Sequence, residues 1–167
     1  MPPIVIPQNL SLIFEDCYNY SKSSPNGYPI MLGNFQRSEL RIEVSATAST
    51  IRDRLLSPTA LKKWLFPQQV TFPSQDLLTV GTKFQTNFGA LMVESQVDRV
   101  NSQSLRLILS KGVDGYHEWY WGEGWVQSRL EGISLLPLNL YQTATLLRLR
   151  HACQERSSSS RPQRQSN

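Results

Sequence analysis

The middle of the chain alternates hydrophobic and polar residues with a period of two, which is the pattern of strands that bury one face. In ELRIEVSA (39–46) the apolar positions are Leu40, Ile42 and Val44. Turn residues separate the further segments that show the pattern, and QQVTF (68–72) reads as a shorter strand. Those segments are TKFQTNF (82–88), LMVESQVDRV (91–100) and SLRLILS (104–110).

The segment GYHEWYWGEGWVQSR (115–129) divides at its glycines into the two strands of a hairpin, about 115–121 and 125–135. In the first strand His117, Trp119 and Trp121 share the more apolar face, which should point inward. In the second strand the inward set is Val126, Ser128 and Leu130. Trp125 does not fit this alternation, and a bulge near Gly124 would resolve the conflict.

Two patterns of helical period flank these strands. After the first strand, Ser49 can cap a short helix that Pro58 ends, and Thr59 can start a second one. After Pro137, about sixteen residues carry an apolar stripe at three- and four-residue steps, typical of a long amphipathic helix. The stripe consists of Leu138, Tyr141, Thr145, Leu149 and Ala152.

The order of elements predicts an α+β fold with one curved antiparallel sheet of about seven strands. Two short helices follow the first strand, and the long C-terminal helix covers one sheet face. We expect this domain to span residues 37–156. Residues 1–36 are irregular and proline-rich, and the first thirty are an artefact of the gene prediction if translation starts at Met31. Residues 157–167 form a polar, basic tail that is expected to be disordered.

Charge and composition narrow the classes of function. The net charge of +4 comes from the C-terminal end, because residues 1–147 hold 12 basic and 12 acidic groups. A nucleic-acid-binding face is therefore not indicated, and membrane contact is at most peripheral, through the tail. No apolar run could span a membrane and no signal peptide is evident, so we expect a cytoplasmic, monomeric protein. The two cysteines and two histidines lie too far apart in sequence to suggest a metal site, and no cofactor motif is present.

His117 is the one candidate for acid–base chemistry, and it is a weak one. Adjacent side chains on a strand point to opposite faces, so Glu118 cannot orient the imidazole. Glu94 and Asp98 also fall on the outward face of their strand. We therefore expect a hydrogen-bonded or exposed histidine at the mouth of a cavity, and we expect Glu123 to be a solvated turn residue.

Several segments resemble the START/Bet v 1-like superfamily, also called SRPBCC or polyketide cyclase-like. The resemblance covers residues 38–155, is loose in its motifs, and points to small bacterial members. It implies a helix-grip fold, in which a cavity between sheet and helix often holds a lipid, a polyketide or another apolar molecule. The segments are ELRIEVSATASTIRDRLLSPTALKKWL (39–65), LTVGTKF (78–84), VDRVNSQSLRLIL (97–109) and LEGISLLPLNL (130–140).

Three functions stay open at this point. The first is the binding or carrying of a hydrophobic small molecule such as a lipid, a polyketide or an isoprenoid-like compound. The second is an enzyme of the cyclase or dehydratase kind that uses His117, and the third is a ligand-free interaction or assembly module. For the first, the predicted ligand-binding residues are Trp64, Phe84, Phe88, Val93, Leu107, Trp119, Trp121, Tyr141 and Thr145, with Trp64 or Phe66 near an entrance.

Overall fold

The computed structural model divides the chain into two units, residues 1–32 and residues 33–167. The structure describes residues 33–89 and 91–159, without the side chains of Phe88 and of residues 155–159. The N-terminal extension, including Met31, and residues 160–167 lie outside the described residues. What the sequence predicts for those two segments therefore stays a prediction.

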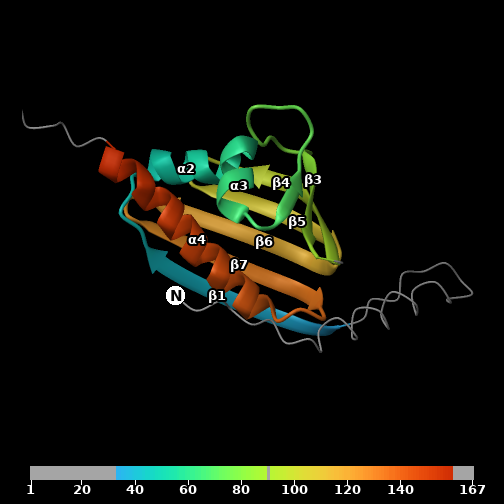
Figure 1. Ribbon diagram of the computed structural model, residues 1–167. Coiled ribbons are helices and arrows are strands. Elements are labelled where there is room, and N and C mark those ends of the chain that lie inside the picture. The colour runs from blue at the N-terminus through green and yellow to red at the C-terminus, as the bar shows by residue number, and fades with distance from the viewer. Residues whose placement is uncertain (1–32, 90, 160–167) are drawn as a thin grey trace, which may run out of the picture. The chain divides into compact units, whose positions relative to one another are not determined.

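Seven strands and three helices make up the described unit (Figure 1). In chain order they are β1 (Asn34–Glu43), α2 (Ala48–Leu56), α3 (Pro58–Leu65), β2 (Gln69–Thr71), β3 (Lys83–Phe88), β4 (Leu91–Val100), β5 (Ser104–Lys111), β6 (Val113–Gly122), β7 (Trp125–Ser134) and α4 (Leu138–Ser159). The predicted α+β order is confirmed.

All seven strands form one antiparallel sheet in the order β1-β7-β6-β5-β4-β3-β2. Strands β2 to β7 follow each other as neighbours, as a meander predicts, and β1 closes the far edge by pairing with β7 from Asn34↔Ser134 to Glu43↔Trp125. Helix α4 lies across β1 and β7, whereas α2 and α3 lie over the other part of the same face (Figure 1). This is the helix-grip arrangement.

The two short helices begin one residue or more before the predicted positions, because other side chains cap them. Thr47, not Ser49, accepts a hydrogen bond from the Thr50 amide and caps α2. Ser57 ends α2 and caps α3, whose first residue is Pro58 rather than Thr59. Proline suits this position because the first helical amide has no intrahelical acceptor.

The outer boundaries of the domain also differ from the prediction. Strand β1 begins at Asn34, so residues 34–36 are extended and paired rather than irregular. Helix α4 continues to Ser159, so residues 157–159, predicted to belong to the disordered tail, are helical.

The β6–β7 hairpin needs no bulge to accommodate Trp125. Its register runs without a shift from Val113↔Ser134 to Gly122↔Trp125, so the predicted bulge near Gly124 is wrong. Trp125 simply points to the outer face, where the guanidinium of Arg41 lies 4.1 Å from its ring centre. In the turn, the carboxylate of exposed Glu123 accepts a hydrogen bond from the Ala48 amide (3.0 Å), so it caps α2 as well as being solvated.

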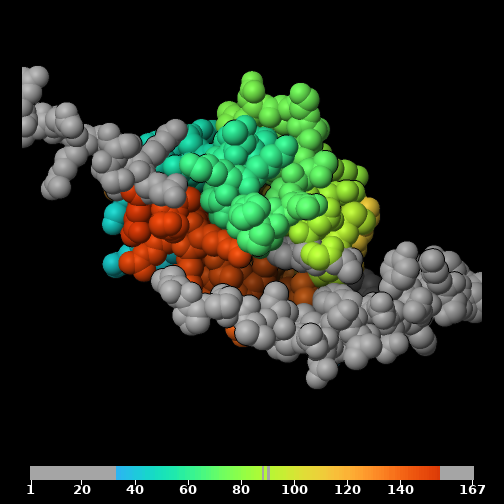
Figure 2. Space-filling view, in the orientation of Figure 1, coloured from blue at the N-terminus to red at the C-terminus, as the bar shows by residue number. Residues whose placement is uncertain are grey.

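The core lies between the concave sheet face and the three helices. In β7 every second residue is buried, Val126 among them, and β4 and β6 contribute buried residues such as Val97, Trp119 and Trp121. Helix α4 contributes Leu138, Leu146 and Leu149, each at most 1% exposed. Figure 2 shows α2 and α3 meeting α4 on the face of the molecule that covers this core.

Candidate functional site

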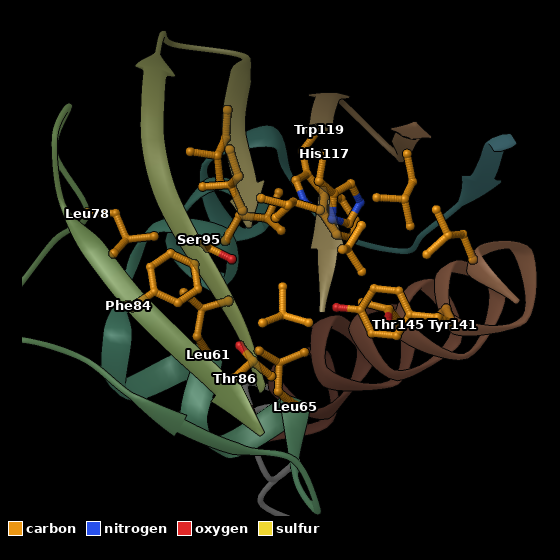
Figure 3. Close-up of a pocket in the computed structure, with 18 of the residues that line it drawn as sticks. Leu61, Leu65, Leu78, Phe84, Thr86, Ser95, His117, Trp119, Tyr141 and Thr145 are labelled. Carbon is orange, nitrogen blue, oxygen red and sulfur yellow. Dashed lines mark hydrogen bonds between the residues drawn. The ribbon is translucent and has the colours of Figure 1, made fainter. Parts of the chain in front are cut away.

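A pocket of about 70 Å³ lies between the sheet, α3 and α4. The sheet and the helices do not fill the space between them: β3 to β7 form one wall, and α3 and α4, with Leu55 of α2, form the opposite one (Figure 3). Twenty residues line it, and they are Leu55, Leu61, Trp64, Leu65, Leu78, Phe84, Thr86, Val93, Ser95, Leu105, Leu107, Leu109, Val113, His117, Trp119, Leu130, Leu136, Leu138, Tyr141 and Thr145.

Most of the residues predicted to line a cavity do lie on this pocket. They are Trp64, Phe84, Val93, Leu107, Trp119, Tyr141 and Thr145. Trp121 does not line it: the side chain is 1% exposed and belongs to the closed core, where the end of β6 lies against α2. The side chain of Phe88 lies outside the described residues.

The two residues proposed for an entrance differ sharply in exposure. Trp64 is buried, lines the pocket, and donates its indole N–H to the Arg54 carbonyl at 2.9 Å. Phe66, in contrast, is 75% exposed and is not part of the lining. Trp64 therefore belongs to the wall, held in place by α2.

Several residues that line the pocket are not predicted by the sequence patterns. Leu61 and Leu65 come from α3, and Leu78 comes from the loop before β3, where its amide donates to the Leu56 carbonyl at 2.9 Å. These residues were visible as apolar positions, but no sequence pattern states that α3 closes the pocket. The polar lining residues Thr86 and Ser95 lie on the predicted inner faces of β3 and β4.

His117 is buried, 4% exposed, and its Nε2 lies 2.7 Å from the hydroxyl oxygen of Ser128. The expected hydrogen-bonded histidine is thus confirmed, but it lies inside the molecule rather than at an exposed mouth. Burial lowers its pKa from 6.5 to about 3, so the imidazole is neutral at physiological pH. Its ring packs against Trp119 at 4.5 Å and meets Tyr141 edge-on at 6.5 Å.

Ser128 connects His117 to helix α4 through Gln142, which is completely buried. The Gln142 side-chain amide donates to the Ser128 hydroxyl oxygen at 2.9 Å and to the Ser128 carbonyl at 2.8 Å. Gln142 stands on the buried side of α4, four residues after Leu138 and three before Thr145. That spacing could have identified it, because a glutamine inside an apolar stripe requires buried hydrogen-bond partners.

The electrostatics of the pocket are those of neutral groups. The lining contains no Asp, Glu, Lys or Arg within the part of the chain that the structure describes. Burial raises the pKa of Tyr141, so its hydroxyl keeps its proton, while a hydrogen bond with Thr145 acts in the opposite direction.

No described set of three or more His, Cys, Asp or Glu side chains could hold a metal ion. Among the described helices, none is both long and apolar enough to cross a membrane.

Comparison with known proteins shows which solved structures share this fold. No protein-family model matches this sequence, and no curated protein is similar enough to match it. Solved structures do match over most of the chain. Major latex-like protein 151 from Panax ginseng has a TM-score of 0.59 at 9% identity, over 74% of this chain and 98% of its own. Protein CV1439 from Chromobacterium violaceum has a TM-score of 0.58 at 19% identity, over 70% and 96%.

A third similar structure is norcoclaurine synthase from Thalictrum flavum, in complex with a transition-state analogue. It has a TM-score of 0.56 at 14% identity and covers 75% of this chain and 98% of its own. At such identities the likeness establishes the architecture alone. The predicted helix-grip fold is therefore confirmed as an architecture, and any function must be argued from the pocket itself.

Proposed function

We propose that this protein binds or carries a small hydrophobic molecule in the pocket between the sheet and α4. The observation that carries the proposal is an apolar space, lined by side chains from the sheet and both sets of helices, in an otherwise closed core. Protein interiors are normally packed without voids larger than a water molecule, so an apolar space of this kind is typical of a binding site.

Burial of the ligand's apolar surface would supply the driving force, at about 25 cal/mol for each Å² removed from water. The polar groups among the lining residues, such as Thr86, Ser95 and His117, would fix the ligand's orientation. Because none of the described lining residues is charged, the walls specify size and shape more than charge.

The size of the space restricts the ligand. At about 70 Å³ the pocket is smaller than the roughly 150 Å³ engineered cavity that accepts benzene. A single ring therefore requires the wall to move outward, and a lipid or a polyketide requires a larger movement. We favour a compact molecule, such as a single ring or a short isoprenoid-like chain, because it needs the smallest displacement of the wall.

The other two hypotheses find less support. An acid–base enzyme of the cyclase kind needs a group that orients and activates His117, but the imidazole bonds to Ser128 rather than to a carboxylate. A filled core would favour a ligand-free assembly module, so the pocket counts against it. The proposal includes action as a monomer in the cytoplasm, which sedimentation and fractionation of the host would test.

The test is native mass spectrometry of the full chain purified from its own host, compared with the same sample after denaturation. We expect an additional mass in the native spectrum that denaturation releases. Leu107→Trp places a larger side chain in the pocket and should abolish the additional mass. Ile108→Trp is the matched control, because Ile108 is the next residue of β5, points outward and is 41% exposed. Absence of a bound molecule from wild-type protein would contradict the proposal.

A further inference from the structure

We propose that His117 presents a single hydrogen-bond donor, its Nδ1–H, to the pocket. The ligand is then an uncharged molecule with an acceptor oxygen that receives this hydrogen bond, such as the carbonyl oxygen of a ketone, an aldehyde or an ester. This inference rests on the proposed function and specifies the chemical class of ligand for the same pocket. It follows from hydrogen-bond accounting around Ser128, from the surface left open on the imidazole, and from the charges of the wall.

The accounting begins at Gln142, whose amide nitrogen faces the carbonyl oxygens of Ser128 (2.8 Å) and Ser38 (3.3 Å). Only a donor satisfies those contacts, so the amide orientation is fixed. The same nitrogen lies 2.9 Å from the Ser128 hydroxyl oxygen and, because an amide nitrogen does not accept hydrogen bonds, the hydroxyl proton of Ser128 cannot be donated to it. The hydroxyl proton of Ser128 is then left to donate elsewhere.

Among the described residues, the acceptor within reach of that proton is Nε2 of His117, at 2.7 Å. Ser128 is completely buried, so no solvent can take the proton instead. A buried hydroxyl without an acceptor loses its hydrogen bond to water and gains none in return, which favours the arrangement in which Ser128 donates to Nε2. Neutral imidazole carries one proton, so this arrangement places it on Nδ1.

Nδ1 has its open side toward the pocket. Within the described residues Nδ1 makes no hydrogen bond. Trp121 Nε1 and Gln142 Oε1 also lack a partner but are fully enclosed, whereas Nδ1 keeps some accessible surface. Because His117 is only 4% exposed and lines the pocket, the surface available to Nδ1 belongs to the pocket. Figure 3 shows the His117 ring on the wall that faces Tyr141 of α4.

The charge of the wall selects against an anion. A buried carboxylate needs a cation or several donors to offset the loss of water, and the described lining offers no Lys or Arg. His117 does not supply the charge either, because its burial disfavours the imidazolium. An uncharged acceptor needs only the one neutral donor that Nδ1–H provides.

Two measurements on the full-length protein test the inference. The first is a long-range ¹H–¹⁵N NMR spectrum of protein with ¹⁵N-labelled histidine, assigned with His117→Phe. We expect the proton of His117 on Nδ1. In Ser128→Ala, which removes the donor to Nε2 without touching the pocket lining, we expect a mixture of the two neutral tautomers. A proton on Nε2 in the wild type would overturn the inference without affecting the proposed function.

The second measurement is an NMR titration with three probes of similar shape: cyclohexanone, methylenecyclohexane and cyclohexanecarboxylate. We expect the ketone to bind roughly 2- to 12-fold more tightly than the alkene, and the carboxylate to bind most weakly. In His117→Phe the two neutral probes should bind alike. Thr86→Val is the control, since it removes a different polar group of the lining and should keep the preference.

The outcomes separate the two proposals. Equal binding of ketone and alkene to the wild type, or tightest binding of the carboxylate, would overturn the inference and leave the hydrophobic pocket in place. Binding of none of the probes, together with no molecule recovered from the host, would contradict the proposed function and the inference that depends on it.

Discussion

Strand β6 has two faces that use polar side chains in opposite ways. On the inner face, His117 and the neighbouring Ser128 form neutral hydrogen bonds out of contact with solvent. On the outer face, Tyr116 and Glu118 stand among arginines. The same alternation of residues therefore builds a neutral, apolar interior and an ionic exterior, and the pocket that we assign to the ligand lies on the interior side.

The outer face is a lattice of ion pairs in which the arginines are partly exposed and Glu118 is buried beneath them. Glu118 lies between Arg106 (3.6 Å) and Arg129 (3.9 Å), and both guanidinium groups lie over the Tyr116 ring. A hydrogen bond from Tyr116, and next one from Arg129, lower the pKa of Glu131. Such pairs contribute little stability each and are screened by salt, whereas the inner hydrogen bonds are shielded from it.

The largest difference between the faces should appear on truncation of neighbouring aromatic residues. Trp121→Ala empties a position that is 1% exposed and should cost about 3–5 kcal/mol of unfolding free energy. Tyr120→Ala, on the outer face of the same strand and 39% exposed, should cost far less. Urea denaturation followed by fluorescence measures both, and similar losses would contradict the division into faces.

The second difference lies in pH dependence. The pKa of His117 is about 3 in the folded protein and 6.5 ordinarily, so between these values only the unfolded chain binds the proton. Stability is therefore complete above pH 6.5 and falls as pH decreases, by at most about 1.4 kcal/mol per pH unit. Glu131, whose pKa is lowered from 4.5, acts only at lower pH.

The window from pH 6.5 to 5 thus isolates the inner face. Urea denaturation across it should show a slope that His117→Phe removes. The slope should persist in 0.5 M NaCl, because its cause is burial of the imidazole rather than an exposed charge pair. A wild-type protein without this slope would show that His117 is not buried as described.

A smaller effect is expected when Ser128 is replaced by alanine. The substitution leaves His117 Nε2 without its partner, at a cost of about 1–3 kcal/mol. Ser110→Ala on the neighbouring strand β5 serves as the control, because Ser110 is only partly buried. Equal losses at Ser128 and at Ser110, which is not buried, would contradict the role of the inner network.

The smallest effect concerns the outer lattice. Glu131→Gln removes the carboxylate that accepts the Tyr116 hydroxyl at 2.6 Å and that raises the pKa of Tyr116. The pKa of Tyr116 should move toward its ordinary value of 10, as measured by NMR titration of the labelled tyrosine ring. Ligand binding should not change, because none of the described lining residues lies on the outer face. Altered binding would link the two faces.

Much of this architecture could be predicted because it depends on local periodicity. Alternation identified the inner faces, including His117 and Trp119, and the turn residues separated the strands. The position of α3 over the pocket and the contact of Gln142 with Ser128 could not be predicted, since both depend on how distant elements pack. Alternation correctly places Trp121 on the inner face, but it does not state where along a strand the space lies, and Trp121 belongs to the closed core.

The central claim is that the inner face encloses a space that accepts a small apolar molecule. Intermolecular NOEs between cyclohexanone and the methyl groups of the methyl-labelled protein test it most directly. The account predicts NOEs to Leu107, Thr86 and Thr145, which line the pocket. NOEs confined to Leu140 and Leu147, which are 64% and 54% exposed on α4, or no NOEs at all, would contradict it.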